Sequence, residues 1–313
     1  MGFLKHNSLH EGDSQSKMLE IESGSIALSF WSPPYFVGKH YEENETYNSW
    51  QALLKKVVEN HSGILKPGGF MVINIADILC FKDEAMPKVQ VLNLSLQKSH
   101  VTRKDVLEAQ KQYPELNRYQ LAELLGCSEQ TIDRRLHGNN IRGGKYALQT
   151  RVQLVGEQLN SYASSVGLYL YDKRIWVKDP AWANSKWTTN TLKGVDEYED
   201  LYIFWKPGEF TIDRRKLTKS EWTNWGKRRV WHIPSVSRND DHEAKFPVEL
   251  ARRVIRLYSE EGDLVLDPFV GSGTTVIAAA ELNRNYLGID KEKKYVDLAE
   301  KNISRFKSQM KLI

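Results

Sequence analysis

Cysteine is scarce in this sequence of 313 residues, and long apolar runs and a strong excess of one charge are missing. Its two cysteines, Cys80 and Cys127, cannot form a disulfide framework or a zinc site on their own. No apolar run reaches the ~18 residues of a membrane span, and no signal peptide is recognisable. The net charge is only +4, which permits a polyanionic partner without requiring one. We therefore expect a reduced, cytoplasmic protein that makes no membrane contact.

Hydrophobic residues and tryptophan, in contrast, are plentiful. The hydrophobic fraction of 41% is enough for one large core and a smaller module. Seven of the nine tryptophans fall between Trp176 and Trp231. These rings suit either a core or a surface on which bases stack, and we favour the core.

The apolar run Ile26–Trp31 ends abruptly at Ser32-Pro33-Pro34-Tyr35. Such a run predicts a buried strand, and the prolines end it because neither can donate a ladder hydrogen bond. The chain then offers a hydroxyl, a stiff turn with free carbonyl groups and an aromatic ring. These groups suit a flat molecule that carries an exocyclic amine, although a plain proline turn at a strand end has the same pattern.

A helix and a second strand continue this pattern. Apolar residues at helical spacing predict a helix over Tyr47–His61, and a turn at Ile64–Gly69 leads into a buried strand over Phe70–Ala76. Strand, helix and strand in alternation predict a parallel α/β sheet. Upstream, Gly12-Asp13-Ser14 is typical of a turn or a helix cap.

Short polar helices replace this alternation from about Lys98. A helix candidate covers Asp105–Tyr113, and two amphipathic segments, Arg118–Leu125 and Ser128–Leu136, are joined at Gly126. This pattern is typical of a helix-turn-helix unit.

The second of these two segments has polar side chains that would donate to phosphates or base edges: Gln130, Thr131, Arg134 and Arg135. A small helical insertion that contacts protein has the same pattern, so DNA contact is one of two interpretations. The basic loop that follows contains Arg142 and Lys145, which form either a linker or a phosphate contact.

The α/β pattern resumes near residue 151. A helix is predicted over Arg151–Ser165. Two strands follow it, one over Leu168–Tyr171 with Arg174–Val177 and one over Tyr198–Trp205. A basic stretch over residues 207–230 includes Arg214 and Arg215. Such a stretch forms a solvated face or, beside a nucleic-acid cleft, supplies affinity that weakens as salt rises.

The last part of the chain contains a glycine-rich turn between a strand and a helix. The predicted elements are the helix Val248–Ser259, the strand and turn Asp263–Thr275, the helix Val276–Leu282, the strand Tyr286–Asp290 and the helix Lys294–Phe306. The turn lets backbone approach a ligand closely, and Asp290 at the end of the next strand can accept hydrogen bonds from a ribose diol.

A dinucleotide is one candidate ligand for this turn. However, Gly271-Ser272-Gly273 lacks the third glycine of the nicotinamide fingerprint, and Asp267 would repel a pyrophosphate. An acid at this position suits a ligand with positive charge, such as the amino group or sulfonium of S-adenosylmethionine.

Two motifs together resemble a known family. Asp267-Pro268-Phe269-Val270-Gly271-Ser272-Gly273-Thr274-Thr275 is similar to the cofactor motif, and Ser32-Pro33-Pro34-Tyr35 to the catalytic motif, of the amino-methylating DNA methyltransferases. These enzymes modify cytosine N4 or adenine N6. The order, with the catalytic motif first, resembles their beta group. Phe246-Pro247 and Leu65–Gly69 also fit the family pattern, and Asp13 falls where the family places an acid near the adenine of the cofactor.

The resemblance implies a Rossmann-like methyltransferase core, an α/β fold with a mixed, mostly parallel sheet, helices on both faces and an inserted helix-turn-helix module. It implies S-adenosyl-L-methionine as the cofactor and assigns to its site Asp13, Phe246, Pro247, Asp267, Phe269, Gly271, Ser272, Gly273, Thr274 and Asp290. Ser32 and the Pro33 carbonyl would accept the hydrogens of the target amine, and Tyr35 would stack on the base. The methyl group would transfer in line to a flipped base, with no metal and no covalent intermediate.

Several alternatives remain within this class and beyond it. Serine at the first motif position resembles the cytosine-N4 enzymes, whereas Asp or Asn there resembles the adenine-N6 enzymes. Methylation of cytosine C5 needs a cysteine that in its family follows proline, and neither Cys80 nor Cys127 does. A DNA-binding regulator with a degenerate core, and RNA or protein methylation, are weaker alternatives.

We expect residues 1–97 and 151–313 to form the methyltransferase core and residues 98–150 to form an inserted module. This module and the basic stretch over residues 207–230 would recognise the target, which departs from the usual arrangement of the family. The implied partners are double-stranded DNA and a cognate restriction endonuclease, with the protein a monomer or a weak dimer.

Overall fold

The computed structural model describes residues 2–36, 46–87, 99–137, 150–180, 192–236 and 246–310. The chain divides into two compact units. The first comprises residues 1–78, 152–185 and 195–313, and the second comprises residues 79–151 and 186–194. The second unit thus begins earlier than residue 98 and also takes in a segment beyond residue 150.

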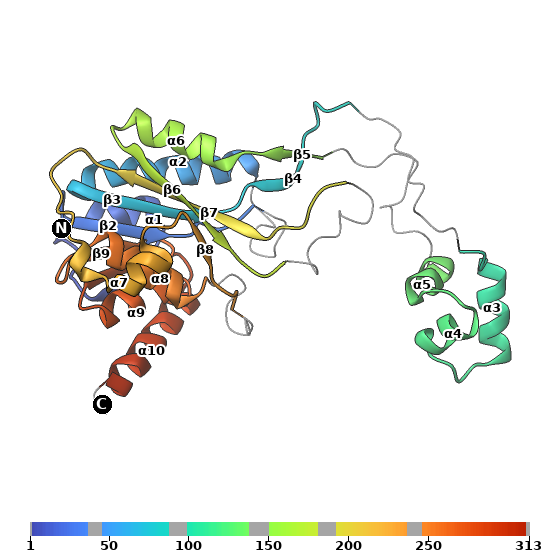
Figure 1. Cartoon of the computed structure of the whole chain (residues 1–313). Helices are drawn as coiled ribbons and strands as arrows, with labels where there is room; N and C mark the ends of the chain where they lie inside the picture. The colour runs from blue at the N-terminus through green and yellow to red at the C-terminus, as the bar shows by residue number, and fades with distance from the viewer. Residues whose placement is uncertain are drawn as a thin grey trace. The chain divides into compact units, whose positions relative to one another are not determined.

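The first unit is built on an eight-stranded sheet with the order β1-β10-β9-β2-β3-β7-β6-β8 (Figure 1). Its strands are β1 (Ser8–Glu11), β2 (Ile26–Trp31), β3 (Leu65–Ile75), β6 (Tyr169–Val177), β7 (Tyr198–Trp205), β8 (Val230–His232), β9 (Leu264–Asp267) and β10 (Asn285–Asp290). From β1 to β3 all neighbours run parallel, β7 is antiparallel to both β3 and β6, and β8 is parallel to β6. The expected mixed, mostly parallel sheet is confirmed.

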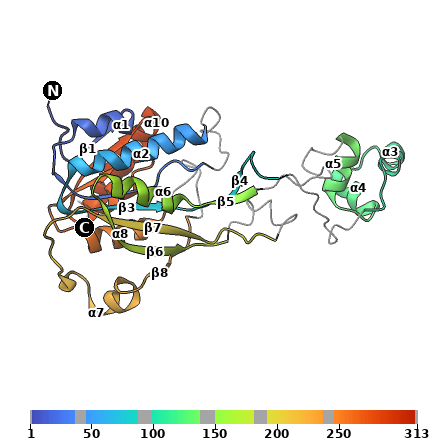
Figure 2. The ribbon, with the colours of Figure 1, turned by 90° about the horizontal axis from the view of Figure 1, so that it is seen from above.

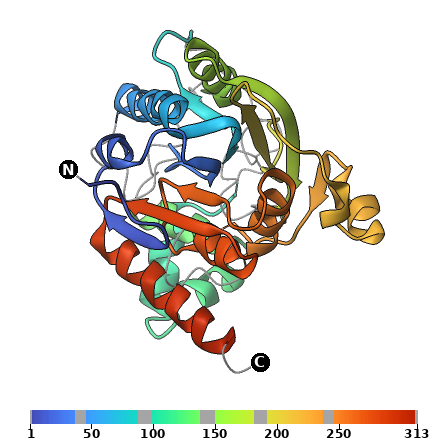
Figure 3. The same ribbon diagram turned by 90° about the vertical axis from the view of Figure 1, so that its left-hand side faces the viewer.

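Helices cover both faces of this sheet (Figures 2 and 3). One face carries α1 (Ser14–Lys17), α2 (Tyr47–Ile64) and α6 (Val155–Ser165), and the other carries α8 (Val248–Tyr258), α9 (Thr274–Glu281) and α10 (Lys293–Met310). Helix α2 begins at a capping box of Thr46 and Ser49 and buries Trp50, Leu54 and Val57 at helical spacing.

The main core lies between the sheet and helices α8 and α9. It joins Phe30 and Val72 of the sheet to Val254 of α8 and Val276 of α9. Of the tryptophan-rich region, Trp176, Trp225 and Trp231 are buried, and Trp205 and Trp222 pack partly buried against this core. These five are core residues, as expected, whereas Trp182 and Trp187 lie outside the described residues.

Two sequence-based boundaries were wrong. The turn expected at Ile64–Gly69 is a shift of register inside β3, where Gly68 has φ 81° and its N–H donates to the Lys206 carbonyl at 3.0 Å. The helix expected from Arg151 starts at Val155, whose N–H donates to Asp77 Oδ1 at 2.7 Å, and residues 150–153 form a strand. The first strand expected after this helix, over Leu168–Tyr171 with Arg174–Val177, is β6.

The described part of the second unit contains three short helices. They are α3 (Arg103–Gln112), α4 (Arg118–Leu124) and α5 (Glu129–His137). Val106, Leu121 and Ile132, one from each helix, pack into a small core of their own. Between α4 and α5 the chain turns at Gly126, which has φ 60°. Strands β4 (Ile78–Lys82) and β5 (Thr150–Gln153) pair in a separate two-stranded sheet.

Three further short elements lie between β7 and β8. They are a 3-10 turn at Arg214–Lys216, α7 (Lys219–Glu221) and a π-turn at Trp222–Gly226. A further 3-10 turn, Met18–Glu20, follows α1.

Candidate active site

The carboxyl ends of three neighbouring strands lie side by side at one edge of the sheet. Strand β9 pairs in parallel with both β10 and β2. Asp290, Asp267 and Ser32 therefore stand at the ends of adjacent strands, although Ser32 is far from the other two in the sequence. Ligands of open parallel sheets bind at this edge. The fold thus brings the predicted catalytic and cofactor motifs together.

The loop between β9 and α9 leaves its backbone open to a ligand. Gly271 and Gly273 have φ 48° and 90°, values that glycine adopts without strain. Gly273 caps α9, which begins at Thr274, and a Cβ on Gly273 would stand 3.1 Å from the Ala299 Cβ. The Ser272 carbonyl is held by Asn302 Nδ2 at 2.9 Å. The loop is therefore a fixed cradle with backbone N–H groups at the start of a helix.

Asp290 connects this loop to the N-terminal segment. Its carboxylate accepts hydrogen bonds from the N–H groups of Gly271 and Glu292, both at 3.0 Å. Burial raises the pKa of Asp290. Its backbone carbonyl accepts from Gly12 N at 2.9 Å, so Asp13 follows directly at the same edge. Asp13 caps α1 through a bond from Gln15 N at 3.4 Å, which makes the expected helix cap correct.

Asp267 is buried, with 2% of its surface exposed. Burial raises the pKa of Asp267 to about 7; the nearby Asp290 contributes to the rise, whereas hydrogen bonds from Thr275 and the Phe269 N–H oppose it. A carboxyl group held in this way gains from a cation placed beside it.

Aromatic side chains on the two faces of β2 join the motifs to the strand. The Phe246 ring lies 5.0 Å from Phe30, and Pro247 then caps α8. The Phe269 ring lies 5.4 Å from Trp31 on the other face. The segment that flanks the cofactor motif is thus anchored on the strand that carries Ser32.

Ser32 and Tyr35 share one network of hydrogen bonds. Ser32 Oγ lies 2.9 Å from the Asn74 carbonyl oxygen and 3.0 Å from the Tyr35 hydroxyl. The Tyr35 hydroxyl donates to Glu199 Oε2 at 2.6 Å. Burial, with the Glu199 charge, raises the pKa of Tyr35 well above its ordinary value. Pro33 is buried. The Pro34 carbonyl accepts a hydrogen bond from Trp50 Nε1 at 2.7 Å, which fixes the turn between Ser32 and Tyr35.

Three residues of this network were missed by the sequence analysis: Asn74, Glu199 and Lys178. Asn74 Nδ2 donates to Glu199 Oε2 at 2.5 Å, and Lys178 Nζ lies 2.8 Å from Glu199 Oε1 and 3.1 Å from Asp196. Desolvation lowers the pKa of Lys178, but the charges of Glu199 and Asp196 outweigh it, so the net shift is upward. The available signal was a polar side chain within a mostly apolar strand, at Asn74 in β3 and at Glu199 in β7.

The polar residues predicted on the second short helix lie on α5 with different surroundings. Gln130 and Arg134 are exposed, and Thr131 contacts the Ser128 hydroxyl at 3.1 Å. Arg135 departs from the expected outward position, because its Nε donates to the Val101 carbonyl at 2.7 Å. Arg142 and Lys145 lie outside the described residues.

Arg214 and Arg215 are not brought to the edge that carries Ser32. Arg214 stacks over Trp222 at 4.9 Å and lines a cavity of about 570 Å³ with Ala27 and Asp263, at the amino ends of β2 and β9. Arg215 pairs with Asp213 at 2.9 Å. These two arginines therefore face the opposite edge of the sheet.

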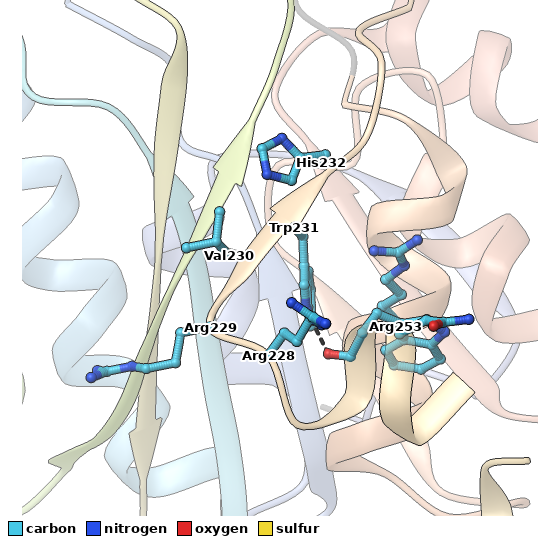
Figure 4. A pocket seen from close by; sticks show the side chains of 8 residues that line it. Arg228, Arg229, Val230, Trp231, His232 and Arg253 are labelled. Carbon is cyan, nitrogen blue, oxygen red and sulfur yellow. Dashed lines mark hydrogen bonds between the residues drawn. The ribbon is translucent and has the colours of Figure 1, made fainter. Parts of the chain in front are cut away.

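A second group of basic residues surrounds β8 (Figure 4). Arg228, Arg229, His232 and Arg253 line a cavity of about 480 Å³. Arg253 lies over the Trp225 ring at 5.3 Å. In Figure 4 the Arg229 side chain points away from Arg253. Because β8 runs parallel to β6, and β6 and β3 are both antiparallel to β7, His232 stands at the same sheet edge as Ser32.

Two kinds of feature are absent from the described ranges. These ranges hold no group of three or more His, Cys, Asp or Glu side chains arranged to bind a metal ion. Within the same ranges, no helix has the length and apolar character needed to cross a membrane.

The comparisons with known proteins agree with this geometry. A family model described as DNA methylase matches residues 26–301. The chain belongs to this DNA methylase family. Type II methyltransferase M.BglI of Bacillus subtilis is 59% identical over 304 residues, which cover 97% of this chain and 87% of that protein.

Solved structures of DNA methylases share the fold. TTHA0409 from Thermus thermophilus, solved with S-adenosyl-L-methionine, has a TM-score of 0.61 and 25% identity and is matched over 96% of this chain and 94% of its own. The PvuII DNA methyltransferase (cytosine-N4-specific) has a TM-score of 0.62 with 16% identity, over 98% and 93% of the two chains, which shows the fold alone. This DNA methylase is a methyltransferase whose cofactor is S-adenosyl-L-methionine. The glycine cradle and the buried acid at Asp267 fit a cofactor with an adenosine and a positive charge.

Proposed function

We propose that this DNA methylase transfers a methyl group to the exocyclic N4 amine of cytosine in double-stranded DNA, as a member of the beta group. The observation that carries the proposal is Ser32, which stands at the end of β2 beside the cofactor loop and bonds to the Asn74 carbonyl at 2.9 Å. Serine at this motif position, rather than Asp or Asn, favours cytosine N4 over adenine N6.

The proposed roles follow from the chemistry of the amine. An amine conjugated to a ring is a poor nucleophile, and acceptors for both of its hydrogens favour a tetrahedral nitrogen with its lone pair toward the methyl donor. Ser32 Oγ and the Pro33 carbonyl supply these acceptors, and the Tyr35 ring stacks on the flipped base. Bound S-adenosyl-L-methionine supplies an electrophilic methyl group on a sulfonium.

The residues around the loop would hold the cofactor. Asp290 accepts from the ribose diol, and Asp13 lies near the adenine. The backbone of Gly271, Ser272, Gly273 and Thr274, flanked by Phe246, Pro247 and Phe269, encloses the rest. The Asp267 carboxylate lies beside the positive charge of the cofactor, and its burial strengthens the attraction between the two.

We also infer that two basic regions contact the DNA. The second unit presents Gln130 and Arg134 on α5, in the manner of a helix-turn-helix, and the first unit presents Arg228 and His232 near the catalytic edge. The likeness to M.BglI supports a role beside a restriction endonuclease that has the same target site.

The test is to incubate the protein with unmethylated DNA and S-adenosyl-L-methionine and to digest the product to nucleosides. Mass spectrometry is expected to detect N4-methylcytosine, and the Ser32→Ala variant serves as the control for transfer at this site. N6-methyladenine alone would overturn the choice of base and leave the enzyme class intact. Methylation of RNA in preference to DNA in a competition assay would overturn the substrate.

A further inference from the structure

The Ser32 hydroxyl has one proton but must act as an acceptor for the target amine. This requirement rests on the proposed function. If the hydroxyl hydrogen, or a hydrogen donated by a neighbour, occupied the side that faces the base, Ser32 would lose its acceptor role. The direction of each proton around Ser32 therefore decides whether the site is ready for an amine.

The structure contains a chain of groups that directs these protons inward. The Ser32 proton has two acceptors on the inner side, the Asn74 carbonyl at 2.9 Å, which can only accept, and the Tyr35 hydroxyl oxygen at 3.0 Å. The Glu199 carboxylate can also only accept, so it takes the Tyr35 proton at 2.6 Å. With both protons directed inward, no hydrogen occupies the lone pairs of Ser32 Oγ, which stay free for the substrate.

The Glu199 carboxylate stays oriented toward the Tyr35 hydroxyl because hydrogen-bond donors occupy both of its oxygens. Asn74 Nδ2 binds Oε2 at 2.5 Å, and Lys178 Nζ binds Oε1 at 2.8 Å. Only 8% of Glu199 and none of Asn74 is exposed, so water does not replace these partners. A buried carboxylate with a cation and two further donors stays an acceptor.

Four neighbouring strands place these groups in one row. Ser32 follows β2, Asn74 lies in β3, Glu199 in β7 and Lys178 follows β6, and these strands are neighbours in the order β2-β3-β7-β6. Their side chains continue the face that carries Phe30, Val72, Leu201 and Trp176 in the main core. The row is thus a continuous polar layer beneath the motif.

We propose that Glu199, held by Lys178 and Asn74, is a positioning residue that keeps the Tyr35 hydroxyl as a donor away from Ser32 and so leaves Ser32 Oγ as the acceptor for the target amine. It acts through Tyr35 and does not touch the substrate.

The central test is the isosteric variant Glu199→Gln, alone and with Tyr35→Phe. Glutamine has one carbonyl oxygen for three donors, so its NH2 group faces Tyr35 and turns the Tyr35 proton toward Ser32. We expect methyl transfer to unmethylated plasmid DNA to fall about 100-fold in single turnover, the scale of a misplaced reacting group. The dissociation constant for S-adenosyl-L-methionine is expected to stay within about twofold, because the cofactor loop is untouched.

The double variant separates positioning from general damage. Tyr35→Phe keeps the ring but removes the misdirected proton, so we expect it to cost about tenfold alone and to restore Glu199→Gln to that same level. Independent losses that multiply to about 1000-fold would overturn the proposal, as would a Glu199→Gln enzyme that equals the wild type. An inactive wild type would instead overturn the proposed function.

Asp200 supplies a matched control on the same strand. It is also a buried acid, and it accepts from the Tyr202 hydroxyl at 3.0 Å and pairs with Lys173 at 2.9 Å, but its side chain points to the opposite face. Asp200→Asn is expected to keep transfer within about threefold of the wild type. A loss equal to that of Glu199→Gln would assign the effect to buried charge and overturn the proposal.

Lys178→Met provides a second variant should Glu199→Gln not fold. It keeps both Tyr35 and Glu199 but leaves the buried carboxylate without its cation, with Asp196 the remaining acid beside it. Without Lys178, Glu199 Oε1 loses its donor, so the carboxylate is no longer fixed with Oε2 toward Tyr35. We expect single-turnover methyl transfer to fall about tenfold while the dissociation constant for S-adenosyl-L-methionine stays within about twofold, and a rate of transfer equal to that of the wild type would overturn the proposal.

Discussion

The proposed site has two sides. On the side proposed for the cofactor, backbone atoms of the loop after β9 provide most of the structure. On the Ser32 side, side chains from four strands provide it. The loop after β9 depends on two positive-φ glycines and on N–H groups held by Asp290. The Ser32 side depends on Asn74, Glu199 and Lys178, which come from separate strands. A change on one side should therefore affect one ligand and leave the other unaffected.

The largest effect is expected from Ser32→Ala. Loss of one acceptor for the amine should lower methyl transfer about 100- to 1000-fold, the cost of removing one preorganised hydrogen-bonding group. The dissociation constant for S-adenosyl-L-methionine, measured by calorimetry, should not change. Weaker cofactor binding by this variant would break the separation between the two sides.

The cofactor side should respond to pH through Asp267, whose pKa burial raises to about 7. Below this pH the carboxyl is protonated and neutral, so its attraction for a cationic ligand is lost as pH falls. We expect the dissociation constant for S-adenosyl-L-methionine to rise by up to about tenfold per pH unit below about 7. Asp267→Asn should bind weakly at every pH with a flat profile, and a flat profile in the wild type would contradict the assignment.

Gly273→Ala tests whether backbone conformation sets the cofactor loop. Gly273 has φ 90°, where a Cβ costs about 1 to 2 kcal/mol, and this Cβ would stand 3.1 Å from Ala299. Urea unfolding should report a loss of stability of that size. Gly63→Ala in α2 is the matched control, because no atom lies within 4 Å of its added Cβ, and alanine there should stabilise the protein by about 0.5 to 1 kcal/mol.

The smallest effect is expected from Arg134→Ala on α5. An exposed arginine that contacts a phosphate contributes about one unit to the slope of log K against log salt, so the slope should fall by about one with a severalfold loss of DNA affinity. Lys104→Ala on α3 is the control, since Lys104 is also exposed but lies on another helix of the same unit. Equal losses of DNA affinity in both variants would indicate that the overall charge of the unit, and not a contact of Arg134 with the DNA, accounts for the effect.

Local motifs were predictable from the sequence, whereas the row beneath Ser32 was not. The strand that ends at Ser32, the glycine turn and the acid at Asp290 each depend on neighbours in the chain, and the structure contains all three. Asn74, Glu199 and Lys178 meet only through the pairing of β3, β7 and β6, and no local pattern specifies that pairing. Arg135 was misjudged for a related reason, because its partner Val101 lies before α3.

The pairing of β1 with β10 has a consequence for synthesis of the chain. Among the strands that the structure describes, β1 pairs with β10 alone, and β10 spans Asn285–Asp290. A ribosome therefore releases Asp13 long before its edge of the sheet exists, whereas β2 and β3 can pair much earlier. The proposed cofactor site is complete only after Asp290 has been synthesised, so a chain truncated before β10 retains β2 and β3 around Ser32 and lacks the edge proposed to bind the methyl donor.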